Sequence, residues 1–190
     1  MLIGGIAAPL FVVTPGQINF QVPWQLAGKT QVPLSVTSAD MTSAPIMVPV
    51  ANQAPGIFQL TAAGQAAALI AGTSTIVAPA GAYAGSRAAN PGEYITIFCT
   101  GLGPVSNQPA TGALASSTVL SYTSGTVTAS IGGVNAPVIF SGLAPGFLGL
   151  YQVNAQVPLN APAGSTVPIT ITMGNTVSNQ ATIAVASAGS

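Results

Sequence analysis

The chain has 190 residues, enough for one large domain or two small ones to bury a core without metal or disulfide crosslinks. Its charged side chains are Lys29, Arg87, Asp40 and Glu93, 2% of the residues, where an ordinary soluble domain carries about 25%. This composition excludes the basic surface of a nucleic-acid-binding protein. A net charge near zero also leaves little repulsion between copies, so we expect a neutral, hydroxyl-rich exterior that favours self-association.

The opening stretch, residues 1–13, is apolar like the centre of a signal peptide. No basic residue precedes it and no small-residue cleavage pattern ends it, and the repeat described next indicates a strand instead. Elsewhere Gly, Pro, Thr, Gln and Asn interrupt every apolar stretch before it reaches the about 18 residues of a membrane-spanning helix. We therefore expect no membrane span.

Blocks of sequence recur in the same order along the chain. Ile3–Pro9 (IGGIAAP) matches Ile131–Pro137 (IGGVNAP), Gln17–Pro23 (QINFQVP) matches Gln152–Pro158 (QVNAQVP), Val32–Thr37 (VPLSVT) matches Val167–Thr172 (VPITIT), and Ser43–Val50 keeps that register against Ser178–Val185. Turn-like stretches of Gly, Pro and Ala separate the blocks. This arrangement indicates that one structural motif is written twice.

Each block alternates apolar and polar residues and ends in Gly or Pro, which is typical of half-buried antiparallel strands. The second copy also has a strand at Glu93–Thr100, a corner at Gly101–Pro104 and a strand at Gly125–Ile131. The Ala-rich stretch Gly64–Ala71 is the best helix candidate, but Gly, Thr, Ser and Pro enclose it, so we expect a hairpin or short turn there. The pattern predicts an all-β fold of immunoglobulin-like antiparallel β-sandwich units.

Aligning the copies predicts three segments. Residues 1–51 form a partial β-sandwich repeat, residues 52–89 a bridging hairpin or loop, and residues 90–190 a complete immunoglobulin-like β-sandwich repeat. The complete copy has the roughly 100 residues and about seven strands of that fold. The first copy begins at its Gly-Gly block and has no counterpart of residues 90–130, so we expect it to lack its opening strands.

Several motifs carry a resemblance to a known family. They are residues 15–24 (PGQINFQVPW), 54–58 (APGIF), 90–98 (NPGEYITIF), 100–104 (TGLGP) and 143–147 (LAPGF). The chain resembles, over essentially its whole length, the uncharacterised C-terminal domain family of large secreted proteins of acidobacteria of the Solibacter type. Its strand, corner and strand are also similar to the IPT/TIG immunoglobulin-like module.

The family resemblance implies an exported protein, extracellular or at the cell surface, and it implies no activity. Members of the family usually carry a strand like residues 91–104 before the first copy as well. The resemblance therefore leaves two alternatives open: the chain is a segment of a longer protein, or the missing strands come from a neighbour.

Catalytic and metal-binding residues are scarce. The sequence has no His, the commonest general base and metal ligand. Asp40 and Glu93 lie in turns of different copies, so we expect solvated side chains and no paired-carboxylate site. A Ser with Lys29 as base would need a strained Ser elbow, and Lys29 lies in a loop without one. We predict no enzymatic activity, no cofactor and no metal.

Cys99 is the single cysteine, so no disulfide forms within the chain. Strand alternation places it on the same face as Ile95 and Ile97. Because no His and no basic residue lies near it in the sequence, we expect a buried small hydrophobic residue and not a reactive thiol.

Trp24 and two rows of amides are the candidates for a glycan site. Trp24 follows Pro23 at a strand end, where it either contacts a sugar or closes the end of the sandwich, and we favour closure. Gln17, Asn19 and Gln21 share a strand face, as do Gln152, Asn154 and Gln156 in the other copy. These rows bind glycan, pair with another amide row or are solvated, and we favour packing or pairing.

The function that we predict is a secreted structural protein that self-assembles into an extracellular filament or surface layer by β-strand complementation between copies. Residues 1–13 or 181–190 are the candidate donors, with Ile3, Ile6, Leu10, Val12, Ile183 and Val185 as the strand-exchange residues. The alternative is a glycan-binding or adhesive module of a larger secreted protein, with polysaccharide as its partner and Trp24 as its contact.

Overall fold

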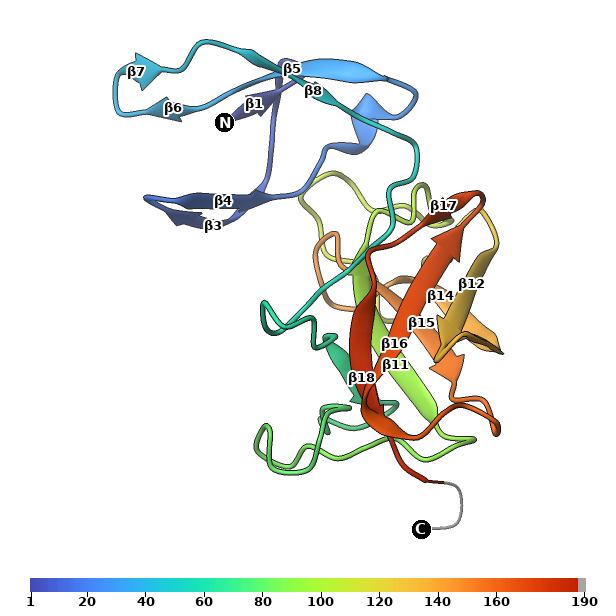
Figure 1. The fold of residues 1–190 in the computed structure, drawn as a ribbon. Helices are drawn as coiled ribbons and strands as arrows, with labels where there is room; N and C mark the ends of the chain where they lie inside the picture. The colour runs from blue at the N-terminus through green and yellow to red at the C-terminus, as the bar shows by residue number, and fades with distance from the viewer. Residues whose placement is uncertain (188–190) are drawn as a thin grey trace.

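The structure, a computed structural model, describes residues 1–187, and within them the chain is all-β with a single turn of 3-10 helix, η1 (Trp24–Leu26). This confirms the predicted fold class. Figure 1 shows one lobe built from the strands near the N-terminus and a second lobe built from β11 and the strands that follow it. All strand pairs within the sheets are antiparallel.

The N-terminal lobe has one four-stranded sheet and two hairpins. The sheet, here called the β5 sheet, has the order β2 (Ile6–Ala7), β1 (Leu2–Ile3), β5 (Gln31–Ser35), β8 (Ile46–Pro49). The hairpins are β3 (Leu10–Thr14) with β4 (Gln17–Phe20), and β6 (Thr37–Ser38) with β7 (Met41–Thr42). The β3–β4 hairpin forms a separate layer from the β5 sheet (Figure 1).

The C-terminal lobe has two sheets. The β11 sheet has the order β10 (Ala68–Ile70), β11 (Tyr94–Thr100), β15 (Tyr151–Gln156), β14 (Val138–Leu143), and β9 (Gly56–Ile57) also pairs with β11. The β16 sheet has the order β13 (Val134–Ala136), β12 (Val127–Ile131), β16 (Gly164–Met173), β17 (Thr176–Val177), and β18 (Ala181–Val185) also pairs with β16. Alternate residues of both sheets meet in one apolar core.

Strand pairing repeats residue by residue between the two lobes. Ile3 pairs with Ile6 and Leu34, and its counterpart Ile131 pairs with Val134 and Ile169. The β3–β4 and β14–β15 pairs even share a bulge at the same point, between Leu10 and Val12 and between Val138 and Phe140. We call residues 1–50 the N-terminal repeat and residues 127–185 the C-terminal repeat. The repeat in the sequence is therefore a repeat in structure.

The segment 52–89, expected to be a bridge, contributes to the core of the C-terminal lobe. Its strands β9 and β10 both pair with β11, on the edge opposite β15, and Val77 and Ala89 are fully buried. Sequence comparison could not assign this segment, because it has no counterpart in the other copy and its strands are short. Most of the stretch Gly64–Ala71, expected to be a hairpin or short turn, is extended: Gln65 and Ala66 form β-bridges and Ala68–Ile70 form β10, while turns lie at residues 62–63 and 71–72.

The corner after β11 depends on two glycines. Gly101 has a φ of +74°, and a Cβ there would lie 1.9 Å from the carbonyl oxygen of Ala54. Gly103 has a φ of +78°, and its Cβ would lie 2.7 Å from the carbonyl oxygen of Asn52. Because both obstacles are backbone atoms, no rotamer change relieves them. The corner thus lets residues 52–54 lie directly against the end of β11.

We predict that Gly101→Ala lowers the free energy of unfolding by about 3 kcal/mol or more, from a left-handed backbone and a backbone clash together. Gly72→Ala is the matched control, because Gly72 has the same φ of +74° but no atom within 4 Å of an added Cβ. This control should cost only about 1 kcal/mol. Denaturant unfolding measures both values, and equal costs would contradict the proposed close approach.

Candidate functional site: an open strand site in the N-terminal repeat

The central strand of the C-terminal lobe is β11, which pairs with β15 along its whole length. Ile95 lies opposite Ala155, and Ile97 lies opposite Val153. All of these side chains are fully buried. β11 thereby forms hydrogen bonds with the backbone N–H and C=O groups of β15, and it closes the core between the two sheets.

In the N-terminal repeat, β4 takes the place of β15 but pairs only with β3 among the strands of residues 1–187. The N–H of Gln21 donates to the carbonyl of Pro9 at 2.9 Å, on the β3 side. Because backbone groups alternate sides along a strand, those of Ile18 and Phe20 face away from β3. Their counterparts Val153 and Ala155 are the residues that lie opposite the buried isoleucines of β11.

β11 is preceded by residues 89–93, here called the lead-in segment, which runs between β15 and β18. The N–H of Gly92 donates to the carbonyl of Val157 at 2.8 Å, and the N–H of Val157 donates to Glu93 at 2.8 Å. On the other side, the N–H of Ala89 donates to Ala184 at 3.0 Å. The lead-in segment therefore joins the ends of the two sheets.

The equivalent space in the N-terminal repeat is a cavity of about 430 Å³. It lies between residues 20–24, at and beyond the end of β4, and residues 49–54, at and beyond the end of β8. The C-terminal lobe completes the wall with the loop residues Gly101, Gly103 and Gln108 and with Tyr151 at the start of β15. Val22 and Ala51 correspond to Val157 and Ala186, and within residues 1–187 neither of their N–H groups donates to a protein acceptor. We call this cavity and the free edge of β4 the open strand site.

Side chains around the open strand site are less buried than their counterparts. Leu34, Val36 and Val48 are only partly buried, whereas the corresponding Ile169, Ile171 and Ile183 are at most 1% exposed. On the β3–β4 hairpin, Val13 is 64% exposed and Leu10 is 45% exposed. The same strand pattern therefore forms a closed core in one repeat and an open apolar surface in the other, because no strand of residues 1–187 fills the place of β11.

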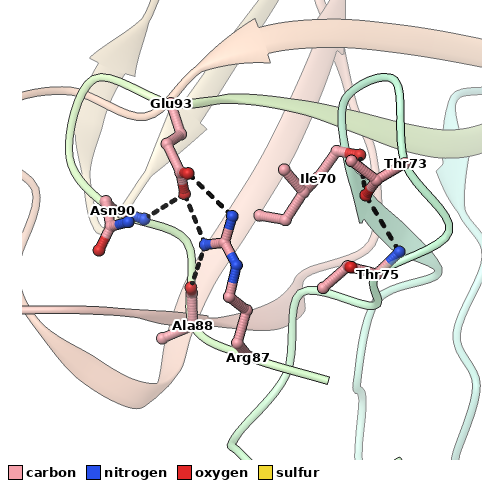
Figure 2. Close-up of polar contacts among 7 residues, drawn as sticks. All are labelled: Ile70, Thr73, Thr75, Arg87, Ala88, Asn90 and Glu93. Atoms are coloured by element: carbon pink, nitrogen blue, oxygen red, sulfur yellow. Dashed lines mark hydrogen bonds and ion pairs between the residues drawn. The ribbon is translucent and has the colours of Figure 1, made fainter. Parts of the chain in front are cut away.

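Within residues 1–187, interactions between charged side chains stabilise only the place that is occupied by the chain's own strand, in the C-terminal lobe. Figure 2 shows the guanidinium of Arg87 facing the carboxylate of Glu93, with Nη1 to Oε2 at 2.8 Å and Nη2 to Oε1 at 2.9 Å. The N–H of Asn90 also donates to Glu93 Oε2 at 2.7 Å. The hydrogen bonds from Arg87 lower the pKa of Glu93, and Glu93 raises the pKa of Arg87. This pair fastens the lead-in segment, and the remaining charges, Lys29 and Asp40, are exposed.

We predict that stability falls as the pH drops below the ordinary Glu pKa of 4.5, because the pKa of Glu93 is lower in the folded chain than in the unfolded chain. The carboxylate stabilises the fold above pH 4.5, and this stabilisation is lost as the pH falls through the folded-state pKa. Glu93→Gln should remove it, at a cost of at most about 1 kcal/mol near neutral pH since both side chains contact solvent. Urea unfolding between about pH 6 and pH 3 tests this, and an unchanged pH slope in the variant would contradict it.

Trp24 lies between the two lobes. Its side chain is partly buried and packs against the core of the C-terminal lobe, and its N–H backbone group donates to Thr111 Oγ1 at 3.2 Å. The indole Nε1 is buried and has no hydrogen-bond partner among the described residues. This placement favours the closing role over the glycan contact.

The amide rows bond within the molecule. Gln17 Nε2 donates to Asn19 Oδ1 at 2.6 Å, and Gln21 Oε1 accepts from the N–H of Gly112 at 2.8 Å. In the C-terminal repeat Gln152 Nε2 donates to Asn154 at 3.4 Å, and Gln156 Nε2 donates to the carbonyl of Gly92 at 2.9 Å. Gln21 and Gln156 therefore anchor their strands to neighbouring loops.

The expected strand-exchange residues all lie in strands that are paired within the chain. Ile3 is 2% exposed in β1, and Ile6 is partly buried in β2. Leu10 and Val12 are 45% and 43% exposed on β3, while Ile183 and Val185 are buried in β18. Residues 188–190 of the expected donor 181–190 lie outside the described residues. The residues at the free edge, Ile18 and Phe20, were not singled out from the sequence, although the missing counterpart of residues 90–130 pointed to their strand.

The other candidate residues, Cys99, Asp40 and Glu93, do not come together in one site. Cys99 is buried in the C-terminal core beside Tyr151, and burial raises the pKa of its thiol to about 12. Burial also raises the pKa of Tyr151, whose hydroxyl donates to the carbonyl of Gly103. Asp40 lies in the exposed β6–β7 turn, in a different lobe from Glu93. Among residues 1–187, no helix has the length and apolar character needed to span a membrane.

In comparisons with known proteins, no family model, no curated protein and no solved structure matches this chain.

Proposed function

We propose that this chain is a structural subunit of an extracellular assembly, in which the open strand site receives a β-strand from a neighbouring polypeptide. The observation that supports this proposal is internal to the molecule. The C-terminal lobe places residues 89–100 where the N-terminal repeat has a free strand edge and a cavity. The neighbour's strand takes the same place by β-augmentation.

The chemistry of the site suits an extended peptide. The free edge offers backbone donors and acceptors at every second residue, Ile18 and Phe20, and these give affinity without charge. The inward face is apolar, so burial of the donor's alternate side chains stabilises the complex by about 25 cal/mol per Å² of apolar surface removed from water. Leu34 of β5 and Ile46 and Val48 of β8, which are partly buried or exposed, become the second wall of the donor's binding site.

Two ways of joining copies are disfavoured by the structure. Donation of β1–β3 or of β18 would open the core from which the strand is taken, since Ile3 and Ile183 are buried where they lie. Antiparallel pairing of β4 with the β4 of a second copy would bring the two β5 sheets onto the same face of one four-stranded sheet, where we expect them to compete for space. The donor strand is therefore one whose inward face is not already covered by a second sheet of the donor polypeptide.

The proposed complementation can be tested with a strand fused to a soluble carrier protein. The strand is residues 89–101 of this chain with Cys99→Ser, and the acceptor is the full chain. We expect saturable binding in a titration followed by fluorescence anisotropy, with little dependence on salt because few charges can be screened. Ile18→Lys in the acceptor should weaken binding at least about tenfold, because the donor would bury the ammonium.

Asn19→Lys is the matched control for that variant. It adds the same charge one residue along β4, but its side chain points to the outer face of the hairpin, so binding should stay within about twofold. Absence of binding to the unmodified chain, both by this strand and by the same strand with Ile95→Ala, would contradict the proposed function. Equal loss in both lysine variants would place the peptide somewhere other than the inward face of β4.

A further inference from the structure

The open strand site differs from its occupied counterpart in the size of one inward side chain. We propose, resting on the proposed function, that the donor strand carries a small residue, Gly or Ala, at the position facing Phe20. Phe20 thereby selects against strands that resemble the chain's own β11, which has Ile95 at that position.

The register of the occupied site identifies the facing positions. Ile95 lies directly opposite Ala155, and Ile97 lies directly opposite Val153. The shared pairing of β3–β4 and β14–β15 makes Phe20 the counterpart of Ala155 and Ile18 the counterpart of Val153. A donor strand in the β11 register therefore presents one inward residue to Phe20 and the next to Ile18.

Ile18 and Phe20 leave different amounts of space for the donor side chains that face them. Ile18 exceeds Val153 by one methylene, whereas Phe20 exceeds Ala155 by a whole phenyl ring. Val48, which packs on the same N-terminal core as Phe20, is only one methylene smaller than its counterpart Ile183, so it offsets little of the added ring. Protein interiors are close-packed, so the ring of Phe20 takes volume that the donor cannot also fill.

The Phe20 side chain already lies within the space in question. It is partly buried against the N-terminal core of Ile3, Ala8, Leu26 and Val32, and it lines the cavity. An isoleucine facing it would overpack this region, which typically costs about 1 to 3 kcal/mol. A Gly or Ala at the same place leaves the backbone pairing intact and avoids the overlap.

This difference has a consequence for folding. The chain contains one β11 strand and two hairpins that can accept a strand in the same register. A phenylalanine in β4 and an alanine in β15 bias β11 toward β15, because only Ala155 leaves room for Ile95. The same size difference keeps the open strand site available to a donor strand with a smaller side chain at the position facing Phe20.

The test uses carrier-fused strands of residues 89–101, all with Cys99→Ser, titrated into the full chain. Ile95→Ala in the strand should tighten binding about tenfold, since it relieves the overlap with Phe20. The matched change at the next inward position, Ile97→Ala, should weaken binding about tenfold or more, because Ile18 leaves that side chain its space and the truncation opens a cavity.

The reciprocal change in the acceptor should reverse the preference. With Phe20→Ala in the full chain, the strand with Ile95 should bind about tenfold tighter than the strand with Ile95→Ala. Phe20→Leu should give an intermediate ratio, and it serves if Phe20→Ala unfolds the N-terminal repeat. Tighter binding of the Ile95 strand by the unmodified chain, or equal binding of both strands, would overturn the size selection while leaving the proposed function intact. Failure of every strand to bind would overturn the proposed function itself.

Discussion

The pairing of β11 with β15 is the interaction on which the C-terminal lobe depends. β11 is the central strand of its sheet, and its inward residues Ile95, Ile97 and Cys99 are fully buried. A strand in this position satisfies the backbone of its neighbours and separates the apolar faces of two sheets from water at the same time. The lead-in segment adds bonds to the ends of β15 and β18, so one continuous stretch of chain closes the sandwich. In the N-terminal repeat no segment of residues 1–187 takes the place of that stretch, and a free edge, a cavity and a set of half-buried side chains occur together there.

The free edge of β4 has no charged side chains, in keeping with the near absence of charge in the sequence. Natural proteins protect sheet edges with inward-pointing charges, lysines or bulges. Here β4 carries no charged residue, and the ion pair of Arg87 with Glu93 stabilises the lead-in segment of the other lobe. The Leu10–Val12 bulge lies on β3, on the far side of the hairpin from the free edge. In our proposal the size of Phe20, and not charge, protects this edge, because size discriminates between strands where charge would repel all of them.

The two lobes are also joined to each other through the neighbourhood of the open strand site. Trp24 packs against the C-terminal core, Gln21 accepts from Gly112, and Thr111 contacts both Trp24 and Gln25. These contacts follow directly after β4, so a donor strand in the site would touch residues that set the position of the lobes. The assembly that we propose would therefore be sensitive to the shape of the junction as well as to the strand.

The sequence by itself determined the all-β fold, the repeat and even its register, because strand alternation and the Gly and Pro residues at strand ends are local properties. It also indicated which strands the first copy lacks. Only the tertiary structure decided that residues 52–89 belong to the C-terminal core, that Trp24 joins the lobes, and that Ile18 and Phe20 form the free edge. These features depend on which strands become neighbours and on what fills the space between sheets. Such contacts connect residues far apart in the chain. The two repeats have the same alternation of apolar and polar residues, so the sequence alone does not tell which repeat buries its apolar side chains; that depends on the neighbouring strand.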